Sequence, residues 1–326
     1  MFKKVCIYGA GSIGGWMGVR LARAGCDLSV VARGATLAAL QADGLRLHEG
    51  GQEHVAQVKA SDDPAALGVQ DLVVLAVKAP SLPAVAQRIA PLIGPHTRVL
   101  TAMNGVPWWF LHDFGGALAN TPVQAVDATG EIARAIPSPQ VIGCVVHASC
   151  SADAPGVIRH HFGNGLIIGE PSGERSEPVQ ALAALLERAG FATTVSPRIQ
   201  KDIWYKLWGN MTVNPVSAIT GATTDRILGD ELVRGFVSAV MLEAKEIGAR
   251  IGIPIDQQPE DRHAVTMKLG AFKTSMLQDV EAGRAVELDA LVTAVQELGR
   301  RTGVATPFTD ALLGLSRLQA RVRGLY

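Results

Sequence analysis

The sequence has few aromatic residues and no charge imbalance, and the balanced charge argues against one class of protein. Phe, Trp and Tyr make up 5% of the 326 residues, and 30 Lys and Arg balance 30 Asp and Glu. A chain without net charge has no overall basic field, so we expect no nucleic-acid partner. The hydrophobic fraction of 48% is nevertheless ample for sizeable cores, which excludes wholesale disorder.

Long apolar runs and paired cysteines are also missing. The run from Val73 to Val77 is typical and has the length of a strand, far short of the ~18 residues that span a bilayer. Lys3 and Lys4 precede an apolar stretch, as in a secretory signal, but glycines interrupt that stretch, so we predict no targeting segment and no membrane partner. None of the 4 cysteines forms a C-x-x-C pair, which predicts free thiols in a reducing cytoplasm.

The patterning changes near residue 196. Before it, short apolar runs alternate with helical patterns, which predicts an α/β domain with a parallel sheet over residues 1–196. After it, strand signals vanish and long helical periods predict an all-helical domain over residues 197–326. The expected strands are 4–8, 28–32, 45–47, 54–58, 71–77, 98–102, 141–148, 156–160, 166–168 and 191–195. The expected helices are 16–24, 35–42, 81–93, 178–189, 199–212, 232–251, 259–282, 287–302 and 307–321.

A glycine-rich run, Gly9-Ala10-Gly11-Ser12-Ile13-Gly14, directly follows the first expected strand. Its first glycine permits a tight turn, its second lets a pyrophosphate approach the backbone, and its third allows close packing of helix on strand. The helix that starts at Ser12 and Ile13 offers free N–H groups to a phosphate. An ordinary turn that favours glycine is the simpler alternative, but three glycines at these spacings exceed its needs. The run therefore predicts a Rossmann-type domain that binds a dinucleotide.

Arg33 follows the second expected strand, where NAD-binding proteins usually place an acidic residue for the ribose hydroxyls. Its guanidinium is suited to a 2′-phosphate, which it can hold with charge-assisted hydrogen bonds. A solvated surface arginine is the alternative. Because the acidic residue is missing, the sequence favours NADPH over NADH.

Lys206, Asn210 and Asn214 lie at i, i+4 and i+8 on one face of an expected helix. Trp204, Leu207, Trp208 and Met211 indicate that most of this helix is buried, and Asn is a poor residue for a helix interior. We therefore interpret the three polar residues as a functional face rather than as a solvated surface. Pro215 is expected to end or kink the helix just beyond them.

These motifs, taken in order, resemble the ketopantoate reductase (2-dehydropantoate 2-reductase) family over essentially the whole chain. The resemblance rests on the glycine run, Arg33, Val77-Lys78, Asn104-Gly105, the Lys206/Asn210/Asn214 face, Ser275-Met276-Leu277-Gln278-Asp279 and Glu287-Leu288-Asp289. It implies a Rossmann domain followed by a helical domain, with the active site in the cleft between them. The implied activity is NADPH-dependent reduction of a 2-oxo acid, ketopantoate, to the 2-hydroxy acid pantoate in pantothenate biosynthesis.

The resemblance also implies roles for single residues. Lys206 would be catalytic, giving a proton to the substrate carbonyl oxygen, with Glu287 assisting it. Asn210 and Asn214 would orient the substrate, and Ser275 would bind its carboxylate. Lys78 and Asn104 would lie near the cofactor, and Asn104 also near the substrate. From the sequence alone Asn104 fits a turn equally well, and Glu287 fits a plain helix N-terminal charge.

The chain departs from the family at Ala290-Leu291-Val292-Thr293, where Tyr-Ile-Asn-Gly is usual. We therefore expect a reshaped substrate pocket. A related dehydrogenase for a different 2-oxo acid and a non-catalytic NADPH-binding regulator remain open as alternatives. Dimerisation through the helical domain also remains open, because the sequence carries no decisive signature of it.

The spacing of the histidines does not predict a metal site. His160 and His161 are adjacent, so in a strand they point to opposite faces. The other histidines lack a ligand spacing such as H-E-x-x-H, and we expect no metal.

Overall fold

The computed structural model describes residues 2–268 and 270–326 and divides the chain into two compact units. The first unit comprises Met1–Met103 and Gly130–Asp202, and the second comprises Asn104–Thr129 and Ile203–Tyr326. The segment Asn104–Thr129 thus groups with the C-terminal helices, although the sequence analysis assigns it to the N-terminal domain.

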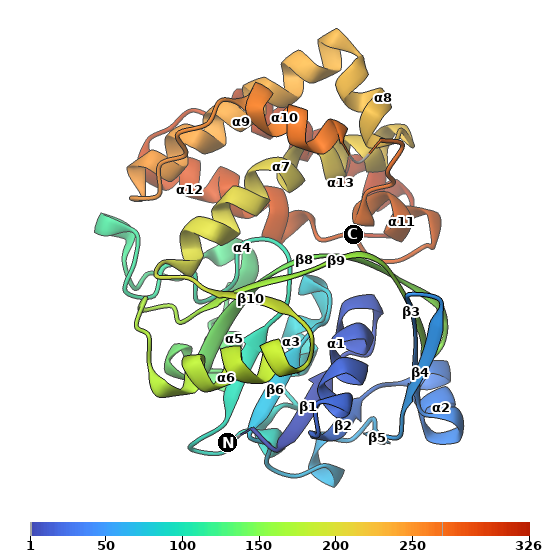
Figure 1. The fold of residues 1–326 in the computed structure, drawn as a ribbon. Helices are drawn as coiled ribbons and strands as arrows, with labels where there is room; N and C mark the ends of the chain where they lie inside the picture. The colour runs from blue at the N-terminus through green and yellow to red at the C-terminus, as the bar shows by residue number, and fades with distance from the viewer. Residues whose placement is uncertain (1, 269) are drawn as a thin grey trace. The chain divides into compact units, whose positions relative to one another are not determined.

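The first unit is built on a ten-stranded sheet whose strand order is β4-β3-β9-β8-β7-β6-β1-β2-β5, with β10 paired to β9 (Figure 1). Strands β5, β2, β1, β6, β7 and β8 run parallel to one another, as a Rossmann-type sheet requires. The strands are β1 (Lys4–Tyr8), β2 (Asp27–Val31), β3 (Leu45–Glu49), β4 (Gln52–Ala56), β5 (Lys59–Ser61), β6 (Leu72–Leu75), β7 (Arg98–Thr101), β8 (Val141–Ala154), β9 (Val157–Gly169) and β10 (Ala192–Val195).

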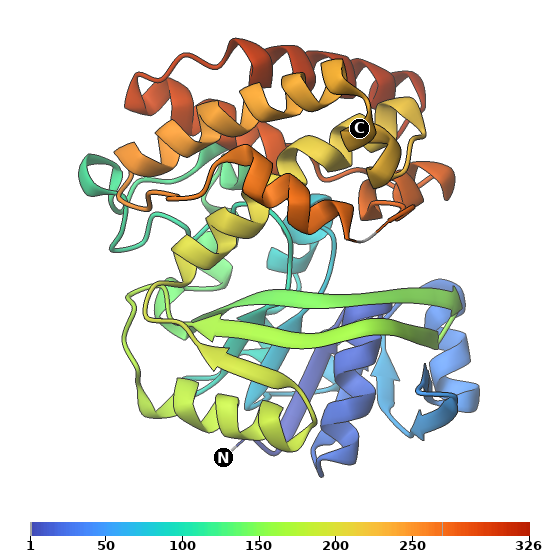
Figure 2. The ribbon, with the colours of Figure 1, turned by 45° about the horizontal axis from the view of Figure 1, so that its top comes forward.

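Continuous apolar runs explain the central strands. All four residues of β6 and the last four of β1 are buried, which is typical of a sheet covered on both faces. The helices of this unit are α1 (Ser12–Arg23), α2 (Gly34–Asp43), α3 (Leu82–Ala86), α5 (Glu131–Ala135) and α6 (Glu177–Arg188). Helix α1 contacts β1 and β2 as well as β3, β8 and β9, so the sheet curls around it (Figure 2).

The β8–β9 hairpin is longer than the sequence predicts. Strands expected at 141–148, 156–160 and 166–168 are parts of two antiparallel strands, which pair from Gly143 with Gly169 to Ala154 with Val157. The ladder is irregular between His147 and Cys150, which explains why the sequence pattern breaks there. Figure 2 shows the two strands side by side, with β10 next to β9.

The second unit contains helices, and no strand is assigned among its described residues. Its elements are α4 (Gln124–Asp127), α7 (Ile199–Thr220, which begins in the first unit), α8 (Thr224–Gly229), α9 (Glu231–Arg250), α10 (Pro259–Met267), α11 (Ser275–Glu281), a π-helical turn (Asp289–Thr293), α12 (Ala294–Thr302) and α13 (Pro307–Val322). Buried Trp109, Phe110 and Trp204 contribute to its core. The predicted fold class, a Rossmann-type domain followed by a helical domain, is confirmed.

Three helix predictions are wrong in detail. Helix α7 continues through Pro215 to Thr220, because the following turns are buried and their packing outweighs the lost backbone hydrogen bond. The expected helix 259–282 is two helices, separated at Gly270 with φ of +63° and restarted by Thr274, whose side chain accepts from the Leu277 N–H. Prolines break the expected helix 81–93 into α3 and two 3-10 turns.

Candidate active site

The glycine run forms a compact turn between β1 and α1. Gly9 has φ of +99°, and a Cβ added there would lie 2.7 Å from Val77 Cγ1. A Cβ at Gly14 would lie 2.1 Å from the Gly9 carbonyl oxygen, so this helix turn packs directly on the loop. At Gly11 an added Cβ would meet no heavy atom within 4 Å. The first and third glycines therefore serve packing, and the second leaves its surroundings open.

The start of α1 has the features of a phosphate site. Gly11 is its N-cap, without a side-chain cap, and no acidic residue lies in its first turn. The first N–H groups of a helix have no partner within the helix, and they carry the positive end of its dipole. Open space beside Gly11 and uncapped N–H groups at Ser12 and Ile13 fit the pyrophosphate of a dinucleotide.

Two cationic residues follow the strands on either side of β1. Arg33 is the exposed N-cap residue of α2, just after β2, and Lys78 is half-buried just after β6. Because β2, β1 and β6 are adjacent and parallel, these cations and the glycine turn share one edge of the sheet. That edge is where doubly wound sheets bind ligands.

Helix α7 is fixed in the second unit by its two tryptophans. Trp204 Nε1 donates to the Ala244 carbonyl at 3.2 Å, and Trp208 Nε1 donates to the Met241 carbonyl at 2.7 Å. Both acceptors belong to α9, so two indoles anchor α7 along that helix. This anchoring sets the rotation of α7 about its axis and thereby the direction of its polar face.

The residues on the polar face of α7 become more buried toward the C-terminal end of the helix. Lys206 and Asn210 are half-buried, and Asn214 is 6% exposed. The three residues share a helix face, as their spacing predicts. Lys206 is therefore not a fully solvated residue of the helix surface.

The loop at Asn104 packs on the segment that follows Glu287. The Val106 N–H donates to the Ala290 carbonyl at 2.8 Å, and a Cβ at Gly105 would lie 2.7 Å from Ala290 Cβ. Gly105 has φ of +85°, which glycine adopts without strain. The contact between Gly105-Val106 and Ala290 forms a backbone junction. Half-buried Asn104 and buried Glu287 lie in the two segments that meet there.

The departure from the family pattern falls in that junction. Ala290 and Val292 are buried in a π-helical turn, a form frequently found at functional sites. A side chain added at Gly105 would collide with the backbone and the Cβ of Ala290. The lack of a side chain at Gly105 is therefore what allows the loop to approach Ala290 this closely.

Ser275 begins α11 and is exposed. The preceding Thr274 accepts from the Leu277 N–H at 3.2 Å and so caps the helix. The capping task thus falls to Thr274, and the Ser275 hydroxyl stays accessible.

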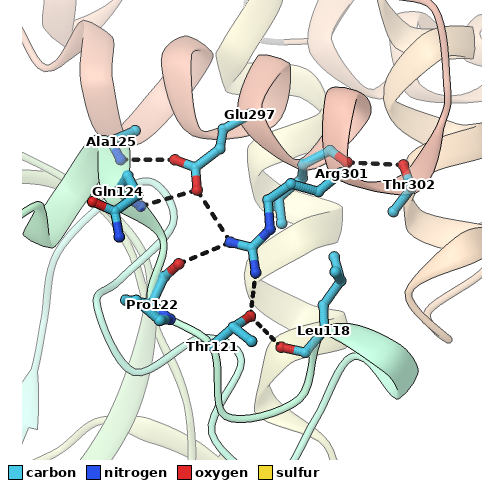
Figure 3. Close-up of polar contacts among 9 residues, drawn as sticks. Leu118, Thr121, Pro122, Gln124, Ala125, Glu297, Arg301 and Thr302 are labelled. Carbon is cyan, nitrogen blue, oxygen red and sulfur yellow. Dashed lines mark hydrogen bonds and ion pairs between the residues drawn. The ribbon is translucent and has the colours of Figure 1, made fainter.

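A carboxylate and a guanidinium hold the segment Asn104–Thr129 in the second unit. Glu297 accepts from the Gln124 and Ala125 N–H groups, at 3.0 and 2.8 Å, at the start of α4 (Figure 3). Arg301 bonds to Glu297 at 3.1 Å and to the Pro122 carbonyl at 2.8 Å. Its other terminal nitrogen bonds to the Thr121 hydroxyl. Charge-assisted bonds to a helix start are among the stronger polar contacts, so they stabilise the fold that carries Asn104.

Sequence reasoning missed Arg262 of α10. Its guanidinium lies over Gly209 of α7 and 5.6 Å from the Tyr205 ring centroid. Burial lowers the pKa of Arg262, and the nearby Tyr205 opposes this. Gly209 in a helix interior signals a close neighbour, but nothing in the sequence identifies that neighbour.

Within residues 2–268 and 270–326, no group of three or more His, Cys, Asp or Glu could hold a metal ion. His160 Nδ1 lies 3.1 Å from Glu49, and His161 Nε2 bonds to the Ser151 hydroxyl, so these two histidines have separate partners. No helix of the described residues is long and apolar enough to span a membrane.

The fold and the glycine turn define a dinucleotide-dependent oxidoreductase. Within that class, the chain belongs to the ketopantoate reductase family. Family models described as ketopantoate reductase PanE/ApbA and its C-terminal domain match residues 5–173 and 198–320.

Relatives of known name or structure agree with this membership. A 2-dehydropantoate 2-reductase of Mesorhizobium japonicum is 50% identical over 324 residues, 99% of each chain. A crystal structure of a protein from Ralstonia solanacearum MolK2 is 58% identical over the full length of both chains, with a TM-score of 0.96. The 2-dehydropantoate 2-reductase of Geobacter metallireducens GS-15 is 25% identical, covers 97% of this chain and 99% of its own, and has a TM-score of 0.85.

Proposed function

We propose that the protein reduces ketopantoate to pantoate with NADPH. The observation that carries the proposal is the 50% identity, over 99% of both chains, to a named 2-dehydropantoate 2-reductase. The open glycine turn and the cationic pair Arg33 and Lys78 support a phosphate-rich dinucleotide. Arg33, at the end of β2, supports NADPH rather than NADH.

The bound cofactor would supply a hydride to the carbonyl carbon of the substrate. The chain itself must then provide a proton for the carbonyl oxygen. Lys206 is suited to this role because its ammonium group stabilises the developing alkoxide before it gives up the proton. Glu287, buried beside the junction with Asn104, would assist Lys206 and the substrate. The half-buried position of Lys206 supports this assignment.

Neutral hydrogen bonds would orient the substrate. Asn210 and Asn214 continue the face of Lys206, and an amide offers both donor and acceptor groups to the oxygens of a hydroxy acid. Asn104 would contact cofactor and substrate, and the exposed Ser275 hydroxyl would bind the carboxylate.

The test is the oxidation of NADPH by purified protein in the presence of ketopantoate, followed by absorbance. Rapid oxidation, with weak activity for NADH, is the expected result. A protein that reduces other 2-oxo acids but not ketopantoate would be a related dehydrogenase. A protein that binds NADPH and reduces no 2-oxo acid would be a regulator.

We further propose that the protein forms a homodimer through α13. Phe308, Ala311, Leu315, Leu318 and Val322 alternate at spacings of three and four residues, as in a coiled-coil seam, and all are exposed. The last three are 61%, 62% and 80% exposed, which is unusual for apolar residues in one row.

Charge supports an antiparallel pair. Asp310 lies near the start of α13, and Arg317 and Arg321 lie toward its end. Two copies related by a twofold axis would place the acidic end of one helix against the basic end of the other. We also infer a cytoplasmic location, which is supported by four free cysteines.

A further inference from the structure

Arg262 lies against the helix that carries Lys206. A Cβ added to Gly209 would lie 3.1 Å from Arg262 Nε, 3.4 Å from Cζ and 3.2 Å from Nη2. Cζ is farther from this point than either nitrogen, so the Nε/Nη2 edge of the group is turned toward the backbone of α7. The ring of Tyr205, four residues before Gly209, lies 5.6 Å from Cζ. The guanidinium therefore covers the row of α7 next to Lys206 and Asn210.

The guanidinium has no acceptor within the described residues. Nε is buried and makes no hydrogen bond, and no ion pair or side-chain hydrogen bond joins Arg262 to residues 2–268 or 270–326. Another arginine with a buried Nε, Arg98, still donates through Nη1 to the Pro139 carbonyl at 2.8 Å. Partly buried arginines normally pair with carboxylates or carbonyl oxygens. Arg262 is thus a half-buried cation whose terminal N–H groups can still take an anion.

We propose that Arg262 binds the carboxylate of the 2-oxo acid substrate, and this rests on the proposed function. In a 2-oxo acid the carbonyl and the carboxylate are joined by one bond. A guanidinium beside the carboxylate would add a charge-assisted contact to the hydroxyl of Ser275, which the proposed function also places there. Lys206 and Gly209 are three residues apart on α7, so the groups above them are neighbours on the helix surface. The two terminal nitrogens of the guanidinium fork remain to hold a carboxylate in bidentate geometry.

Gly209 is part of the same arrangement. Any side chain there would push the guanidinium away by a few tenths of an ångström or more. Alanine in a helix interior otherwise favours the folded state over glycine. Gly209→Ala is therefore expected to keep or raise the melting temperature while it weakens substrate binding. A purely structural role of Arg262 would not separate these two effects.

The test compares the wild type with Arg262→Gln in steady-state reduction of ketopantoate. We expect KM for ketopantoate to rise about 10- to 100-fold, with a smaller fall in kcat and an unchanged Kd for NADPH. The preference for the acid over its methyl ester should shrink by a similar factor. Arg262→Lys should recover part of the loss. Arg250→Gln is the control, because Arg250 is exposed and pairs with Glu246 on its own helix.

Three results would overturn the proposal. The first is an unchanged KM in Arg262→Gln. The second is an equal loss for acid and ester. The third applies if Arg262→Gln does not fold, as shown by a very low melting temperature. The proposal is then refuted if Arg262→Lys and Gly209→Ala are both folded and neither raises KM for ketopantoate.

A failure of the proposed function looks different, because the wild type itself would leave ketopantoate unreduced. The carboxylate role of Arg262 would then be tested by calorimetry. The NADPH complexes of the wild type and of Arg262→Gln would be titrated with pyruvate and with phenylglyoxylate. Binding that is lost in Arg262→Gln would support the carboxylate role. Equal binding, or no binding to the wild type, would refute it.

Discussion

Lys206 is the residue on which the proposed chemistry depends most. Without its ammonium group the carbonyl oxygen has no proton donor, so we expect Lys206→Ala to lower kcat by about 10²- to 10⁴-fold. NADPH binding should persist, because the glycine turn and its cations belong to the first unit. Steady-state kinetics and fluorescence titration with NADPH measure the two effects. Lys201→Ala is the control, since Lys201 is exposed on the same helix. A comparable loss of NADPH affinity would contradict a catalytic role.

Arg33 sets the expected choice of cofactor. Arg33→Asp replaces the group for the 2′-phosphate with one that repels it and can bind ribose hydroxyls. We expect the ratio of kcat/KM for NADPH over NADH to fall by at least about tenfold, since a charged hydrogen bond is worth roughly 1.5–3 kcal/mol. Arg23→Asp is the matched control, placed about 16 Å along α1 from the glycine turn. An unchanged ratio would refute the 2′-phosphate role.

Among the elements, α13 carries the proposal about assembly. Leu315 lies in the middle of the apolar row, so Leu315→Asp would place two carboxylates at the centre of a twofold interface. We expect the variant to be a monomer and the wild type a dimer, as measured by size-exclusion chromatography with light scattering. Leu242→Asp, at an exposed apolar site on α9, is the control. A monomeric wild type at micromolar concentration would rule out the dimer.

An element could be predicted where the local sequence determines its type and its ends, and it could not be predicted where tertiary packing determines them. Strand β1 was predicted at 4–8, because an apolar run followed by the glycine turn leaves little choice. The continuation of α7 past Pro215 was not predicted, because burial of Val213 and Val216 cannot be read from a proline. The π-helical turn at Asp289–Thr293 was not foreseen either, because its residues carry no local pattern that separates it from an α-helical turn.

The candidate site divides in the same way. The glycine turn, Arg33 and the α7 face follow from short spacings along the chain. Arg262 did not, because Gly209 and Arg262 are far apart in sequence and the guanidinium is brought in by the packing of α10. The roles carried over from the family to Lys206, Glu287 and Ser275 remain predictions, and the variants above test them.

For the molecule as a whole, the four cysteines report on folding. Burial raises the pKa of Cys6 and of Cys150 to about 12, and it also raises the pKa of Cys26. At pH 8 a thiol with that pKa is a thiolate in about one molecule in ten thousand. We expect Ellman's reagent to react slowly with these thiols in the native protein and with all four after denaturation. Fast reaction of all four thiols in the native state would contradict the burial of Cys6 and Cys144.

The path of the chain through its two units limits how the protein can be divided. The chain passes from one unit to the other after Met103, after Thr129 and after Asp202. A fragment ending at Asp202 would keep Thr121 and Gln124 but lose Glu297 and Arg301, which hold them. The complementary fragment would keep the ion pair without the helix start that it caps. Neither half is therefore a self-sufficient module for domain exchange, and a recombinant hybrid must carry Asn104–Thr129 together with the C-terminal helices.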